Sequence, residues 1–121
     1  MKTKDISLFF LFLAMLFLFA GCQKSSELIL KEIGPSNTKA GQAFNVQPDG
    51  SAAMWAITNN ATENTLIMWG DRKLVTALKS GKIVTALVPK ELYSRPGQYR
   101  IYLMDSKTGA KSNSLVFTVT E

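Results

Sequence analysis

Few side chains in this sequence could perform chemistry, and their types limit the reactions available. Histidine is absent and cysteine occurs once. Ser–His and Cys–His nucleophile pairs are therefore excluded, together with most zinc and non-haem iron sites. Several serines are present, but none stands in the Gly-x-Ser-x-Gly setting that exposes a catalytic serine at a strand-to-helix turn.

Five of the nine acidic residues lie in or next to predicted turns, where side-chain bonds to nearby backbone account for most of them. They are Asp49, Glu63, Asp71, Glu91 and Asp105. A glycosidase needs two carboxylates across a cleft, and a calcium site needs six to eight oxygens. No second Asp stands close to either aspartate-bearing loop, Asp49-Gly50 or Asp105–Gly109. We therefore predict a non-enzyme with no cofactor and no metal.

The single cysteine, Cys22, follows an apolar N-terminal segment. Two lysines precede the run Ile6–Ala20, in which Ser7 is the one polar residue. This run is shorter than the roughly 20 apolar residues of a spanning helix and is typical of a secretory signal. With Phe19-Ala20-Gly21 directly before it, Cys22 resembles the lipobox cysteine of bacterial lipoproteins.

The resemblance implies a cleaved signal peptide at residues 1–21, a lipidated Cys22 and a short tether at 22–27. Two or more acyl chains give stable membrane anchoring. An ordinary signal peptide or an N-terminal membrane anchor is the alternative. Gln23, rather than Asp, follows the cysteine, which by resemblance to sorting in diderm bacteria favours the outer membrane if the source is diderm. We expect a lipid-anchored protein of the cell envelope.

The charge of the remaining chain is modest. The formal net charge of +5 falls to +4 without residues 1–21. The basic residues are scattered, and no block of five like charges occurs. A nucleic-acid footprint needs clustered basic residues, so we expect no nucleic-acid partner.

Residues 28–121 are expected to form one domain of short strands separated by turns. The apolar runs are rich in Val, Ile, Thr, Tyr and Trp, and no long window keeps a helical period. The segment Lys90–Ser94 is compatible with one helical turn. Seven or eight strands in about 95 residues indicate an all-β, immunoglobulin-like β-sandwich. The predicted strands are Leu28–Ile33, Ala43–Gln47, Ala53–Thr58, Thr65–Trp69, Leu74–Leu78, Ile83–Val88, Gln98–Met104 and Leu115–Thr120.

Alternation along each strand predicts which side chains face the core. Leu115, Phe117 and Val119 share one face of the last strand. The side chains expected inside are Trp55, Ile57, Ile67, Trp69, Val84, Ala86, Val88, Tyr99, Ile101 and Leu103.

This assignment leaves a stripe on the outer face of one sheet. It consists of Met54, Met68, Tyr102, Met104 and Val116. Met and Tyr are adaptable contact residues, and exposed apolar patches of a few hundred Å² mark interaction surfaces. The stripe is our candidate binding face. The alternatives are scattered surface side chains, or an error of one residue in the alternation that would bury them.

The order of several short motifs resembles that of an IPT/TIG domain, an early-set immunoglobulin-like module. The motifs are Ile33-Gly34-Pro35, Ala40-Gly41, Met68-Trp69-Gly70, Val84–Pro89, Arg95–Tyr99, Ser112–Ser114 and Phe117–Val119. Tyr99 also resembles the tyrosine corner of such sandwiches, whose hydroxyl bonds backbone near the crossover. The sequence departs from the pattern at Pro48-Asp49-Gly50, which interrupts a strand that is often longer.

IPT/TIG-like modules usually act as binding or spacer domains, which implies a binding module rather than an enzyme. The first hypothesis is a lipoprotein that binds an envelope protein, as an adaptor, assembly factor or accessory subunit. The alternative is a glycan or cell-wall binder. An exposed Met–Tyr stripe favours the first, whereas an exposed Trp55 or Trp69 favours the second. An enzyme would need a buried carboxylate pair in a cleft.

Overall fold

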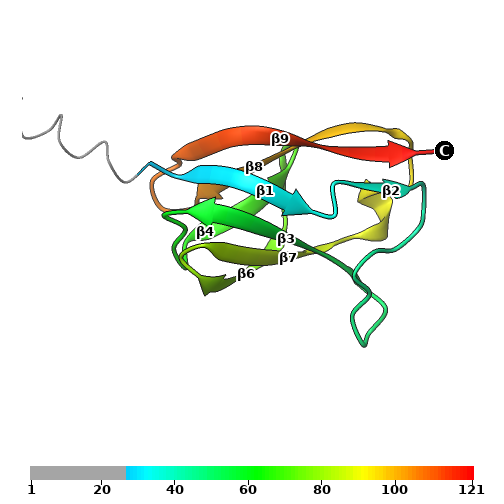
Figure 1. Cartoon of the computed structure of the whole chain (residues 1–121), viewed down its shortest axis with the longest axis horizontal. Helices are drawn as coiled ribbons and strands as arrows, with labels where there is room; N and C mark the ends of the chain where they lie inside the picture. The colour runs from blue at the N-terminus through cyan, green and yellow to red at the C-terminus, as the bar shows by residue number, and fades with distance from the viewer. Residues whose placement is uncertain (1–26) are drawn as a thin grey trace, which may run out of the picture.

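The computed structural model describes residues 27–121, which form two β-sheets packed face to face (Figure 1). The four-stranded sheet has the order β1 (Ile29–Gly34), β3 (Ala52–Asn59), β7 (Ile83–Val88), β6 (Val75–Ser80). The five-stranded sheet has the order β2 (Asn37–Lys39), β9 (Lys111–Thr120), β8 (Gly97–Asp105), β4 (Thr65–Trp69), β5 (Arg72–Lys73). The predicted signal peptide, Cys22 and all of the tether except Glu27 lie outside the described residues.

The strand order is that of an immunoglobulin-like sandwich, so the predicted fold class is confirmed. Such folds place their first, second, fifth and fourth main strands in one sheet and the remaining three in the other. Here the chain begins in the four-stranded sheet as β1 and crosses after Gly34 to the other sheet, where β2 pairs in parallel with β9. This crossing and the short β5 raise the number of strands to nine.

The strand predicted at Ala43–Gln47 is wrong, because this segment is a loop. Asn45 has a left-handed backbone (φ 43°), and its side-chain N–H donates to the carbonyl of Ala53 at 3.1 Å. A residue in this conformation interrupts a strand, and Asn adopts it more readily than most. The loop instead carries Phe44 onto the core, 5.2 Å from the ring of Tyr93 and 5.3 Å from that of Phe117. A 3₁₀ turn, η2 (Lys90–Leu92), follows β7 within the predicted helical segment.

The core lies between the sheets and contains most of the side chains predicted for it. Phe117 is fully buried and contacts Trp69, with ring centroids 4.8 Å apart. Trp69 also packs on Tyr99, whose hydroxyl donates to the carbonyl of Arg95 at 2.7 Å. This bond is the predicted tyrosine corner. The confirmed inward residues are Ile67, Trp69, Val84, Ala86, Val88, Ile101, Leu103, Phe117 and Val119, with Tyr99 and Leu115 packed partly exposed against them.

The alternation predicted for β3 is wrong by one residue. Ala52, Met54, Ala56 and Thr58 are buried, so Trp55 and Ile57 face outward. Both faces of this strand are apolar, and alternation alone therefore cannot distinguish them. Gly34 is the partner of Trp55 on β1, and a Cβ at Gly34 would collide with the indole. The missing side chain gives the indole room to lie on the outer surface.

Side chains also close the open sides of the sandwich. Asn113 of β9 accepts a hydrogen bond from the N–H of Leu30 and donates one to its carbonyl, both at 2.8 Å. On the opposite side, the Thr76 hydroxyl accepts from the N–H of Ile67 at 3.0 Å. These bonds join β1 to β9 and β6 to β4. The edge groups that they occupy are thereby removed from pairing with other chains.

Candidate binding faces

The structure brings four of the five predicted stripe residues together on the outer face of the five-stranded sheet. Met68 and Tyr102 are register partners on β4 and β8, while Met104 and Val116 lie beside them on β8 and β9. Met54 is not part of this face. It lies on β3 of the other sheet, where its side chain points into the core and is only 1% exposed.

The predicted stripe is largely covered by its own neighbours. Met68 is 3% exposed and Tyr102 is 7% exposed. The guanidinium of Arg100 stands 5.0 Å from the ring centroid of Tyr102, and the ammonium of Lys111 stands 5.9 Å from it. Long cationic side chains can lay their methylenes on apolar surface while the charge stays in water. Val116 is the strongly exposed member, so this face presents cations with little apolar area.

A second apolar surface, which was not predicted from the sequence, lies on the opposite side of the molecule. The outer face of the four-stranded sheet exposes Val75 by 74%, and it exposes Trp55, Ile83 and Leu87 by 37% to 39% each. Ile57, Ala53 and Ala77 lie among them on the same face. We call this surface, with Thr85 at its centre, the outer apolar face.

Register places these side chains in three rows across the sheet. The first row runs Ala53, Leu87, Val75. The second row runs Gly34, Trp55, Thr85, Ala77, and the third runs Glu32, Ile57, Ile83, Ser80. Residues directly opposite one another in antiparallel strands share a face. The surface is therefore continuous over all four strands, with a carboxylate at its β1 edge.

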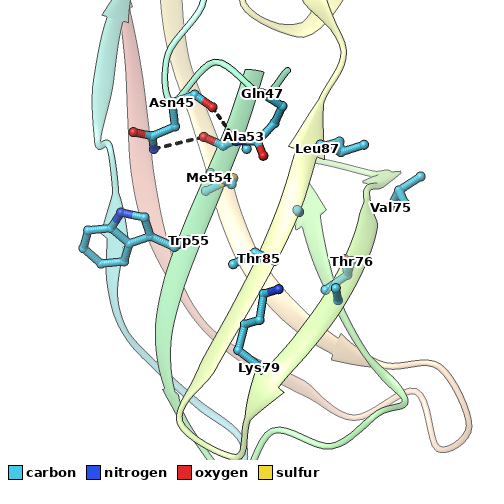
Figure 2. A pocket seen from close by; sticks show the side chains of 12 residues that line it. Asn45, Gln47, Ala53, Met54, Trp55, Val75, Thr76, Lys79, Thr85 and Leu87 are labelled. Carbon is cyan, nitrogen blue, oxygen red and sulfur yellow. Dashed lines mark hydrogen bonds between the residues drawn. The ribbon is translucent and has the colours of Figure 1, made fainter. Parts of the chain in front are cut away.

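A shallow groove of about 370 Å³ crosses the outer apolar face (Figure 2). Leu87 and Val75 lie at one end of it, and Lys79 rises along β6 beside Thr85. The Asn45 loop forms a polar border, where the side-chain N–H of Gln47 donates to the carbonyl of Asn45 at 2.7 Å. The groove thus combines an aliphatic floor with a few polar groups at its margins.

Trp55 borders this groove and is held in place by its neighbour strand. Its indole covers Gly34, which has no side chain to displace it. A tryptophan lying on a glycine of the adjacent strand is a recurrent way of covering exposed backbone. By contrast, Trp69 is 3% exposed and belongs to the core. Of the two tryptophans, Trp55 is therefore the one that is exposed to a ligand or partner.

The carboxylates sit in turns and on the surface. The backbone N–H of Thr108 donates to Asp105 at 3.0 Å and that of Lys107 at 2.8 Å, and these bonds lower the pKa of its carboxyl. The backbone N–H of Ser51 lowers the pKa of Asp49 in the same way. Both groups stay ionised at neutral pH, which suits turn anchors rather than proton donors.

The remaining charged groups offer little chemistry. Arg72 and Glu91 form an exposed ion pair at 2.9 Å, a kind of contact that contributes little to stability. Within residues 27–121, no group of three or more metal-ligating side chains (His, Cys, Asp or Glu) could hold a metal ion. Over the same stretch, no helix has the length and apolar character needed to cross a membrane.

Comparison with known proteins gives no further guide. The chain matches no protein-family model and no curated protein. Function must therefore be argued from the two sheet faces.

Several residues of the outer apolar face lie on strands that are apolar on both faces, so alternation could not predict which set points outward. On β7, Val84, Ala86 and Val88 were placed inward correctly, but Ile83 and Leu87 are equally apolar. A strand that is apolar on both faces is typical of burial on both sides. Here one side is solvent, so the second apolar set marks a surface available to a partner.

Proposed function

We propose that this protein is a non-catalytic, membrane-anchored lipoprotein whose immunoglobulin-like domain binds protein in the cell envelope. The observation that carries this proposal is the outer apolar face, where Trp55, Val75, Ile83 and Leu87 are exposed together. Continuous exposed apolar patches of a few hundred Å² are often interaction sites. The IPT/TIG resemblance of the chain is consistent with a binding role.

The position of this face fits a tethered binding module. The proposed tether enters at Ile29, the first residue of β1, and the chain ends at the opposite end of the long axis (Figure 1). Trp55 and the Asn45 loop lie beside Gly34, the last residue of β1. The groove is therefore turned toward the end of the domain that is remote from the anchor, where a partner can reach it. The proposed location is the cell envelope, at the outer membrane if the source is diderm.

Photo-crosslinking in intact cells tests the protein-binding proposal. A photoreactive residue placed at Leu87 should yield a defined protein adduct, because this position is an exposed part of the outer apolar face. The matched control is the same residue at Val116, which is also exposed but lies on the opposite sheet. Equal adducts at both positions, or no adduct at Leu87, would overturn the proposal.

Anchoring is tested separately by a Cys22→Ala variant. The unaltered chain should fractionate with membranes and should incorporate labelled fatty acid. The variant should do neither, whereas a Ser25→Ala variant should behave like the unaltered chain. Membrane association retained by Cys22→Ala would show that an uncleaved N-terminal segment, rather than acyl chains, holds the protein.

A glycan or cell-wall ligand is the second candidate, and one observation favours it. Trp55 is partly exposed beside Thr85 and the polar Asn45 loop, an arrangement in which a sugar ring could stack on the indole. The aliphatic neighbours Val75 and Leu87 suit protein contacts better, because sugars require many hydrogen-bonding groups. Binding to purified cell wall that is lost in Trp55→Ala and kept in Leu87→Ala would support the glycan alternative.

A further inference from the structure

The outer apolar face is complementary to itself. The second and third rows run from β1 to β6 and the first runs from β3 to β6, and each can be read in either direction. When one copy is turned by 180° about an axis parallel to the strands, β6 of that copy lies over β1 of the other, and β7 lies over β3. Each row of one copy then faces the same row of the other copy, with its residues in the opposite order. A closed pair of this kind uses the same patch on both copies.

In the first two rows, the side chains that meet in this arrangement differ in size. In the first row, Ala53 of each copy meets Leu87 of the other, so a small side chain faces a large one. In the second row, Trp55 meets Thr85. The third row pairs Ile57 with Ile83 at one end of the patch. Alternating large and small residues across facing sheets is how inner faces of sandwiches interdigitate.

Charge complementarity points to the same arrangement. Glu32 lies at the β1 edge of the third row, as the partner of Ile57. Ser80 is the β6 member of that row, and Lys79, in the bulge just before it, lies between the second and third rows and lines the groove beside Thr85 (Figure 2). Reversal of the row brings Glu32 of one copy over Ser80 of the other, next to the ammonium-bearing Lys79 in the bulge. The two-fold axis forms this pair twice.

We propose that the partner of the outer apolar face is a second copy of this chain, bound about a two-fold axis parallel to the strands. This inference rests on the proposed function, since it names the protein that the face binds. The orientation also suits two lipid anchors. An axis parallel to the strands leaves β1 of both copies starting at the same end, so both tethers reach one membrane. An axis across the strands would place the anchors at opposite ends.

The size of the face sets the expected strength of the pair. Four strands spaced by about 4.8 Å and five to six residues of about 3.3 Å each give roughly 350 Å² of flat area per copy. Stable complexes bury about 800 Å² per partner. We therefore expect weak pairing in dilute solution and strong pairing when both copies are held on one membrane, where the effective concentration is high.

Charge reversal tests the arrangement. The protein extracted from its own membranes is placed in phospholipid vesicles, with a photoreactive residue at Leu87. The unaltered chain should give an adduct of twice the monomer mass. Glu32→Lys and Lys79→Glu should each weaken pairing about tenfold, because two attractive pairs become repulsive. The double variant should restore it, and Lys39→Glu, on β2 of the other sheet, should have no effect.

The outcomes separate this inference from the proposed function. Pairing that is unchanged in both single variants, or lost and not restored in the double variant, overturns the proposed arrangement. Circular dichroism of each variant shows that the loss is not one of folding. A Leu87 adduct in cells that contains only a different protein overturns self-association and leaves the protein-binding function standing. Absence of any adduct in both vesicles and cells removes both proposals.

Discussion

Removing the side chain of Asn113 should detach the first strand from the far sheet. Asn113 satisfies both the N–H and the carbonyl of Leu30 at 2.8 Å, across 83 positions of sequence. A hydrogen bond contributes a net of about 0.5–1.5 kcal/mol. Asn113 is itself exposed, so water can reach the edge after truncation. We therefore expect Asn113→Ala to lower the free energy of unfolding by about 1.5 kcal/mol, toward the lower end of the range of about 1–3 kcal/mol for two bonds.

Urea unfolding of residues 27–121 measures this loss, and thermal unfolding should show a midpoint lower by roughly 6–12 °C for a domain of this size. Hydrogen exchange adds a local readout, since the amide of Leu30 should lose protection before the core does. Ser114→Ala, at the next and also exposed position, is the matched control. If Asn113→Ala stays within about 0.5 kcal/mol of that control, the bonds do not hold the edge and the reasoning fails.

Three further changes test other parts of the structure. Tyr99→Phe removes the 2.7 Å bond to Arg95 and should reduce stability by about 1 kcal/mol in urea unfolding. Because the fold lowers the pKa of Asp105 from 3.8, its stabilisation is present above that value and is lost as pH falls through the lower folded value. Asp105→Asn should therefore flatten the fall in urea midpoint between about pH 5 and pH 2. Gly34→Ala should push the Trp55 indole off the surface, which acrylamide quenching would detect as increased accessibility.

The fold was largely predictable because turn residues and strand-length apolar runs mark where most of the strands begin and end. Tyr99 located the tyrosine corner, and the last strand alternated clearly enough to place Phe117 in the core. The short strand β2 was not predictable, because its three residues are polar and its pairing with β9 is distant in sequence. The strand predicted at Ala43–Gln47 is wrong because Asn45 has a left-handed backbone, and an apolar pattern does not reveal this conformation.

The candidate site was predicted less well, for a physical reason. The prediction assumed that one face of each strand is apolar, whereas β3 and β7 are apolar on both. Placing Trp55 inward put Met54 on the surface, and the structure reverses both. The pairing of Trp55 with Gly34, distant in sequence, settles the orientation. Exposure of Tyr102 was likewise overestimated, because neighbouring cations cover it.

The direction in which β1 enters the fold has a mechanical consequence. The strand begins at Ile29, at one end of the long axis, and the chain ends at the other (Figure 1). Tension on the proposed anchor therefore runs along the strand, so that the hydrogen bonds between β1 and β3 are loaded together and not one after another. Asn113 adds a lateral clamp near the loaded end, at Leu30. Parallel loading of bonds resists a pull better than peeling, so the strand nearest the membrane is suited to bear force transmitted through the tether.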